Sequence, residues 1–253
     1  MTKRLIILFL WLIWCASLAQ SLAPQDSSQI GALTDSAYKY LAFQPEKARE
    51  LANEALILSR LKNFKFGEAI ALNRLAESEF RKSNYARSIE LATQSLRLGE
   101  EINNPKAIAM AYRVLGNTNT FGLKRYEVAL KYQLKAYEIL QKLNDVQGIA
   151  SFCGNVTWIY AITNQNLNEA HALAEKGIML SDSLGNLQLL AFNYNSKGLL
   201  FKRQLRFDSA THYLNLSNTY GEKAQDHAVI AYNKSILADI CLQRGETSKA
   251  LQL

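Results

Sequence analysis

The chain has 253 residues, of which 49% are hydrophobic and 20% are charged, a composition that excludes intrinsic disorder and collagen-like structure. Only three residues are Pro, about a quarter of average usage, which favours a chain that is helical almost throughout. The formal net charge is +7, and it falls to +5 over residues 20–253 once Lys3 and Arg4 are set aside. Because this surplus is spread along the chain, it gives no reason to expect nucleic-acid binding.

Residues 1–19 have the layout of a cleavable secretory signal. Two cations precede the unbroken apolar run Leu5–Trp14, and the small residues Ser17 and Ala19 provide a cleavage site. The alternative is a membrane anchor, but a spanning helix needs about 20 apolar residues and this run is about half that length. We therefore predict cleavage after Ala19 and export of the remaining chain, with no membrane span within residues 20–253.

A motif recurs about every forty residues along the rest of the chain. An aromatic or other corner residue is followed three residues later by a small residue, and further small residues come four and seven positions on. The opening small residues follow one another at intervals of forty or forty-one positions, and they are Ala48, Ser88, Ala129, Ala170, Ala210 and Ala250. A second apolar-periodic segment lies upstream of each, so each unit is predicted to be a pair of helices.

Turn-forming residues separate the units at the same period. They are Asn63, residues 103–105, residues 144–145, residues 185–186 and Asp226. The small positions of each motif lie on one helical face, which lets the two helices of a unit approach closely. One pair cannot bury its apolar stripe alone, so the pairs are predicted to stack into an all-α solenoid of antiparallel helix pairs.

The repeated unit resembles the tetratricopeptide repeat family. The residues that carry the resemblance are Tyr194, Gly198, Phe201, Phe207, Ala210, Leu214 and Ser217 in the fifth unit, Leu237, Ala238, Cys241, Gly245 and Ala250 in the sixth, and Tyr112, Leu115, Gly116, Tyr126, Ala129 and Ala136 in the third. The common repeat has about 34 residues, and these repeats are about six residues longer. In this they are similar to the long-helix repeats of kinesin light chains and of many bacterial signalling proteins.

The resemblance covers roughly residues 28–253. We therefore divide the chain into a signal peptide at 1–19, a linker at 20–28 and a repeat array at 29–253. The array holds about five and a half repeats, because only three residues follow Ala250, the opening residue of the sixth second helix. We expect the natural product to continue beyond Leu253 with the rest of that repeat.

The resemblance implies that the first helix of each pair lines a concave groove, where extended peptides or partner helices bind. Carried over residue by residue, the groove positions are Asn73, Arg74, Glu77, Arg81, Arg113, Asn117, Thr120, Asn155, Trp158, Asn195, Leu199, Lys202, Arg203, Tyr232 and Asp239. The basic residues among them are suited to carboxylates. The family's two-carboxylate clamp needs a particular set of Lys and Asn, which this chain does not reproduce. A solvated concave face is the alternative, and Trp158 is either a core residue or a ligand-facing one.

No constellation of residues indicates catalysis. The sequence has three His, with no Cys at ligand spacing, no glycine-rich phosphate loop after a strand, and no hydrolase or kinase signature. We predict no enzymatic activity, no cofactor and no metal site within these residues.

The leading hypothesis is an exported repeat domain that binds a protein or peptide partner. Chains similar to this one often form the extracytoplasmic sensing region of bacterial receptors of the histidine kinase or transcription-regulator type. The alternative is a free periplasmic scaffold or assembly protein with no signalling output. The oligomeric state is left open.

Overall fold

The computed structural model describes residues 24–41 and 43–252, and all regular elements within those ranges are helices. The predicted signal at residues 1–19 lies outside the described residues. The elements are α2 (Pro24–Tyr40), α3 (Pro45–Leu61), α4 (Lys65–Arg81), α5 (Tyr85–Glu101), α6 (Pro105–Asn117), the π-helical turn η1 (Thr118–Gly122), α7 (Tyr126–Lys142), α8 (Val146–Thr163), α9 (Leu167–Ser183), α10 (Leu187–Arg203), α11 (Phe207–Ala224), α12 (His227–Gln243) and α13 (Thr247–Ala250). Residues 24–28, assigned above to a linker, belong to α2.

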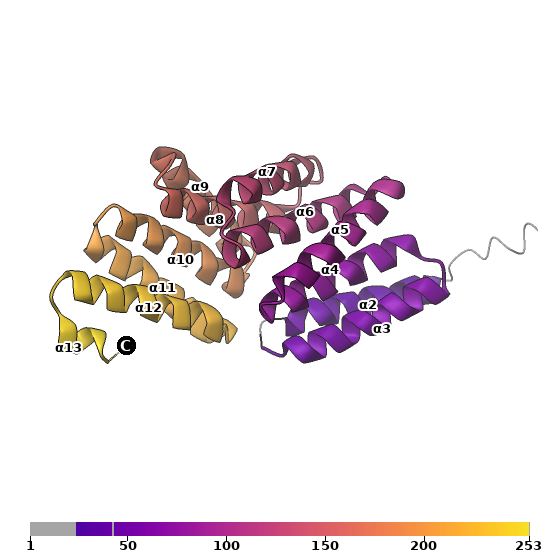
Figure 1. Ribbon diagram of the computed structural model, residues 1–253, viewed down its shortest axis with the longest axis horizontal. Helices are drawn as coiled ribbons and strands as arrows, with labels where there is room; N and C mark the ends of the chain where they lie inside the picture. The colour runs from indigo at the N-terminus through magenta and orange to yellow at the C-terminus, as the bar shows by residue number, and fades with distance from the viewer. Residues whose placement is uncertain (1–23, 42, 253) are drawn as a thin grey trace, which may run out of the picture.

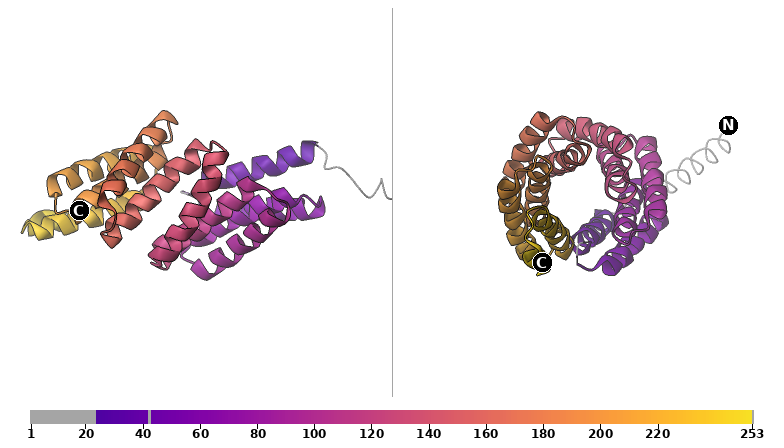
Figure 2. Two further views of the ribbon diagram at one scale, coloured as in Figure 1. Left: turned by 90° about the horizontal axis from the view of Figure 1, so that it is seen from above. Right: turned by 60° about the vertical axis from the view of Figure 1, so that its left-hand side comes forward.

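The helices form a curved stack that winds into a ring (Figures 1 and 2). Each helix packs against the next in chain order, and the first helices of successive pairs also touch, since α4 contacts α6, α8 contacts α10 and α10 contacts α12. The solenoid of helix pairs predicted from the sequence is therefore confirmed.

The spacing of the helices is almost constant. From α3 to α13 successive helices begin at equal intervals, except that the intervals containing α6 and α8 are each one residue longer. In the first of these α6 continues into η1, and a π-helical turn takes up one residue more than an α-helical turn. In the second, α8 has 18 residues and is followed by Asn164 and Asn166, both in the left-handed region. These added residues account for the two longer spacings of the motif in the sequence.

Four of the five turns between the described pairs combine a left-handed residue with a capping side chain, and in the turn between α3 and α4 the left-handed Asn63 is followed by Phe64, which has no capping side chain. Asn103 has φ of 50°, and the side chain of the next residue, Asn104, accepts a hydrogen bond from the Ala107 amide at 3.0 Å. The same arrangement recurs at residues 144–145, 185–186 and 225–226, where Asp145, Asn186 and Asp226 are the caps. The residues predicted to form turns therefore end the last helix of one pair and cap the first helix of the next.

The second helix of each pair buries a stripe of residues at positions 0, 4, 7 and 11 of the motif. The stripe consists of Ala48, Ala52, Ala55 and Ser59 in α3, Ser88, Ala92, Ser95 and Gly99 in α5, Ala129, Gln133, Ala136 and Leu140 in α7, Ala170, Ala174, Gly177 and Ser181 in α9, and Ala210, Leu214, Ser217 and Gly221 in α11. The small face predicted from the first three positions is confirmed, and the structure adds the fourth.

Where this stripe holds a larger residue, the neighbouring first helix holds a glycine. A Cβ on Gly116 would lie 2.7 Å from the amide of Gln133, and a Cβ on Gly198 would lie 2.8 Å from Leu214. Gly148 faces Leu140 in the same way, at 2.5 Å. The two helices of a pair thus keep their close approach, because volume added on one side is removed from the other.

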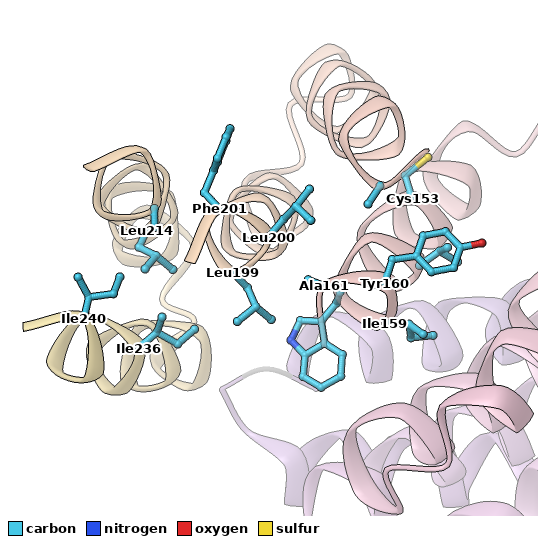
Figure 3. Close-up of a cluster of buried hydrophobic side chains, with 14 of the residues drawn as sticks. Cys153, Ile159, Tyr160, Ala161, Leu199, Leu200, Phe201, Leu214, Ile236 and Ile240 are labelled. Carbon is cyan, nitrogen blue, oxygen red and sulfur yellow. The ribbon is translucent and has the colours of Figure 1, made fainter. Parts of the chain in front are cut away.

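Apolar side chains join the pairs into a continuous core. Figure 3 shows Leu199 of α10 and Leu214 of α11 pointing toward Ile236 and Ile240 of α12, and these residues are at most 5% exposed. Burying each such side chain contributes roughly 1.5–3 kcal/mol. Cys153 lies in the same cluster, and burial raises the pKa of its thiol to about 11, so it acts as a small apolar residue.

The close approach predicts opposite effects for two Gly→Ala substitutions within helices. A Cβ on Gly177 would lie 2.2 Å from the Asn193 side-chain oxygen and 3.0 Å from the Cys153 Cβ, so Gly177→Ala should destabilise the fold by about 1–3 kcal/mol. Gly31 has open space around it, so Gly31→Ala should instead stabilise by about 0.5–1 kcal/mol through helix propensity. Urea unfolding followed by circular dichroism measures both. Equal stabilisation by the two would contradict the close packing.

Candidate functional site

A cavity of about 670 Å³ lies along the first helices of the helix pairs. Its volume falls within the roughly 300–1,000 Å³ typical of ligand pockets. Most of its lining comes from α4, α6, η1, α8, α10 and α12, and Tyr38 adds a contribution from α2. The first helices of the pairs therefore provide this wall.

Nine of the residues expected in the groove line this cavity. They are Arg81, Arg113, Asn117, Thr120, Asn155, Trp158, Asn195, Arg203 and Tyr232. The other six, which are Asn73, Arg74, Glu77, Leu199, Lys202 and Asp239, lie elsewhere.

Asn73 and Leu199 are buried between helices and do not face the groove. The Asn73 amide donates to the Ser95 hydroxyl of α5 at 2.6 Å, and the residue is fully buried. Leu199 is 2% exposed within the core cluster of Figure 3. Lys202 forms an ion pair with Asp239 and so joins α10 to α12.

Arg74, Glu77 and Arg113 form a largely buried ionic cluster. Glu77 accepts hydrogen bonds from Arg74 at 2.8 Å and from Arg113 at 2.5 Å, and the Arg74 guanidinium lies over the Tyr38 ring at 4.5 Å. Burial alone would raise the pKa of the Glu77 carboxyl, but the two guanidinium groups outweigh it and lower that pKa. Arg74 and Arg113, expected above as groove cations, are thus partnered within the protein, and Arg113 is held at the cavity wall.

Three cations on the lining have no ion-pair partner in the described part of the chain. These are Arg81 at the end of α4, Lys124 after η1 and Arg203 at the end of α10. The one carboxylate on the lining is Asp226, which caps α12 through the Val229 amide at 3.2 Å. The wall is therefore electropositive, with charges available to an anionic ligand.

Aromatic side chains line the same wall. The Phe121 ring lies edge-on to Trp158, with 4.8 Å between centroids, and 6.0 Å from the Phe192 ring. The Tyr126 ring also lies near Trp158, with 6.0 Å between centroids. Trp158 is only 7% exposed, yet it belongs both to the core cluster and to the cavity lining. Both of the roles considered for Trp158 are therefore compatible with its position.

The π-helical turn places Phe121 and Lys124 on the wall. The side chains of Thr118, Asn119 and Thr120 donate to the carbonyl groups four residues before them, at 2.8–2.9 Å. These bonds satisfy carbonyl groups near the point where the α-helical pattern changes. Phe121, Lys124, Phe192 and Tyr38 were missed by the sequence analysis. The interval of 41 residues between Ser88 and Ala129 was the signal in the sequence, since it shows that one residue is added within this repeat. Added residues of this kind form π-helical turns, which occur frequently at functional sites.

The described residues show no group of three or more His, Cys, Asp or Glu that could hold a metal ion. Within the same ranges, no helix has both the length and the apolar character needed to cross a membrane.

Residues 67–142 match the family model of the tetratricopeptide repeat. The helices on either side of this stretch continue the same helix-pair pattern, so the described chain forms a solenoid of the tetratricopeptide-repeat type. Among solved structures, the chain is similar to aspartyl phosphate phosphatase F of Bacillus subtilis, with a TM-score of 0.68 and 14% identity over 89% of this chain and 57% of that one. It thus spans little more than half of the phosphatase.

Two further solved structures are similar to the array. The apo form of RapI has a TM-score of 0.69 and 20% identity over 96% of this chain and 85% of that one. A Rap protein complexed with competence and sporulation factor has a TM-score of 0.60 and 17% identity over 89% of this chain and 67% of that one. At these identities the likeness shows the fold alone. A comparison with curated protein sequences gave no match.

The buried ionic cluster predicts a stability loss that depends on pH. Glu77→Gln should destabilise the fold by about 3 kcal/mol at pH 7, because it leaves two largely buried guanidinium groups without their carboxylate. Because the folded-state pKa of Glu77 is lowered, its contribution is complete above the ordinary pKa of 4.5 and is lost as the pH falls through the folded value. Urea unfolding between pH 7 and pH 3 should show the two proteins converging in acid.

Glu46→Gln is the matched control. Glu46 also contacts two cations, Arg49 and Lys82, but its side chain is 57% exposed. Replacing Glu46 by Gln should change the free energy of unfolding only slightly, and the change should be smaller still at high salt. A Glu77→Gln variant as stable as the Glu46→Gln variant would show that the buried cluster is not stabilising.

Proposed function

We propose that this repeat domain binds a peptide or an extended protein segment in the cavity along the first helices of its helix pairs. The observation that carries the proposal is the juxtaposition of three unpartnered cations and a set of aromatic rings on the wall of one cavity, all within the described residues. Aromatic rings provide contact area at low entropic cost, and cations provide charge-assisted hydrogen bonds to an acidic partner.

The chemistry of the lining favours binding over catalysis. The lining residues include no His and no Cys, and Asp226 is engaged as a helix cap. A nucleophile paired with a base is therefore not among the described groups that face the cavity. The similarity in fold to a Rap protein complexed with competence and sporulation factor also supports a binding role.

The export of the domain is a second part of the proposal, and it rests on residues 1–19. A domain on the far side of a membrane that captures a peptide fits a sensing region of a bacterial signalling receptor. The alternative is an assembly factor or scaffold that binds without signalling. The reading frame downstream of Leu253 distinguishes them, since a receptor requires a membrane segment followed by a kinase or regulator module.

The proposed export predicts the first residue of the mature protein. If the signal is cleaved after Ala19, mass spectrometry of exported material should find Gln20 at the N-terminus, in open or cyclised form. Exported protein that begins at Met1 would overturn the localisation.

The proposed binding predicts a charge-dependent affinity. Peptides selected from a random display library should bind the triple variant Arg81→Ala, Lys124→Ala, Arg203→Ala at least about tenfold more weakly, a loss of about 1.4 kcal/mol or more. The charge-matched control replaces Arg97, Lys131 and Lys142, which are exposed and do not line the cavity. Circular dichroism should show equal helicity for both triple variants.

Affinity is measured by fluorescence anisotropy of labelled peptides at two salt concentrations. Binding to the natural chain and to the control variant should weaken as salt increases. Peptides that bind both triple variants equally well would show that the cavity is not the binding site. A library that yields no binder would contradict the proposed peptide-binding function.

A further inference from the structure

Arg203, Tyr232 and Trp158 line the same cavity. Burial is the main cause that raises the pKa of the Tyr232 phenol on α12, and the positive charge of Arg203 acts in the opposite direction. The Tyr232 side chain is nevertheless 39% exposed, so its hydroxyl group is accessible from the cavity. It remains a protonated hydroxyl group at neutral pH, able to donate a hydrogen bond.

Arg203 is available to a ligand because nearby carboxylates are engaged. Asp239 pairs with Lys202, and Asp226 caps α12. Within the described ranges, no carboxylate forms an ion pair with the Arg203 guanidinium, and the side chain is exposed at the cavity wall. A guanidinium and a phenolic hydroxyl on the wall of one cavity are both suitable hydrogen-bond donors for a carboxylate.

The rings beside this pair form an apolar surface of defined shape. Phe121, Trp158 and Phe192 come from η1, α8 and α10, and they meet at centroid distances of 4.8 and 6.0 Å. Phe121 and Phe192 are only partly buried, so their outer faces and edges are available to another ring. Edge-to-face and offset contacts of this kind favour an aromatic partner over an aliphatic one by about 0.5–1.5 kcal/mol.

Two asparagines make a peptide a better fit than other anionic aromatic ligands. Asn155 on α8 and Asn195 on α10 stand at the same position in successive repeats, and both line the cavity. Each uses its amide nitrogen within the protein, toward Asn117 at 2.8 Å and toward Asn233 at 2.6 Å. Both residues are only 2% exposed, but no hydrogen bond to either side-chain oxygen occurs among the described residues, so each oxygen is an unused acceptor at the cavity wall for a backbone N–H group of an extended chain.

We propose that the cavity recognises a peptide in which an acidic residue adjoins an aromatic residue. The carboxylate binds Arg203 and Tyr232, and the aromatic ring packs against Phe121, Trp158 and Phe192. This inference rests on the proposed function and adds the chemistry of its ligand.

The test uses Trp158 as an internal reporter. The chain contains three Trp, and Trp11 and Trp14 lie in the proposed signal, so Trp158 is the sole Trp fluorophore of the protein that begins at Gln20. The probe is a library of capped hexapeptides in which the two central positions sample every residue type except Trp and the flanking positions are Gly and Ser. Peptides with Glu or Asp beside Phe or Tyr should give the largest change in Trp158 emission. Within the best peptide, Glu→Gln or Phe→Ala should each weaken binding about tenfold.

Variants of the protein assign the two parts of the ligand to their partners. Arg203→Gln and Tyr232→Phe should abolish the preference for Glu over Gln while keeping the preference for Phe over Ala. Phe121→Leu should abolish the preference for Phe over Ala while keeping the preference for Glu over Gln. Arg97→Gln, on the exposed face of α5, should change neither preference. Because each comparison is a ratio of two peptides on one folded protein, a variant of lower stability still reports on specificity.

Three outcomes would overturn the inference, and they affect the proposed function differently. Binders without a preference for an acidic residue, or a preference that Arg203→Gln leaves intact, would reject the ligand chemistry and leave peptide binding standing. A Trp158 response to adenosine monophosphate with none to any peptide would reject peptide recognition in favour of a nucleotide. No response to any member of the library would count against the proposed function as well.

Discussion

The close approach of the two helices in each pair is the constraint on which the rest of the structure depends. Residues at positions 0, 4, 7 and 11 of each second helix are buried, and they are small or face a glycine, as Gln133 faces Gly116. This contact sets the rotation of each first helix about its own axis. One face of that helix must then meet its partner, two flanks meet the neighbouring pairs, and the remaining face is left for the cavity. The composition of the wall is therefore a consequence of the packing behind it.

One of the two departures from strict periodicity lies at this wall. From α3 to α13 the helices would begin at uniform intervals but for the added residues at η1 and at the end of α8. The first addition brings Phe121 against Trp158, and hydrogen bonds from Thr118, Asn119 and Thr120 stabilise the altered turn. A π-helical turn of this kind, hydrogen-bonded at the wall of a cavity, is frequent at functional sites.

The sequence predicted the parts of the structure that repeat, and it failed where a contact occurs only once. The pairs, the capped turns and the small face follow from periodicity, which one chain displays several times over. The groove list was less successful because its positions were carried over from a resemblance, and one residue on a helix corresponds to a rotation of about 100°. An error of a single position therefore turns a side chain from the groove to the packed side, and Asn73 and Leu199 are buried in this way. The pairing of Glu77 with Arg113 in the next repeat depends on the stacking angle between pairs, which no local pattern encodes.

The cavity is lined by residues from repeats that are far apart in the stack, whereas most contacts elsewhere in the molecule join neighbouring helices. A solenoid is stabilised mainly between nearest neighbours, so its two ends influence each other weakly. Yet Tyr38 on α2 and Tyr232 on α12 line one cavity, and the Tyr38 hydroxyl already accepts a hydrogen bond from Gln147 of α8 at 3.0 Å. A ligand that fills the cavity would touch helices that are not neighbours in the stack. Its binding energy would then act between distant repeats, where the described chain has few contacts of its own, and would favour one curvature of the ring over others. If the cavity binds the proposed ligand, this geometry would couple ligand capture to the shape of the array.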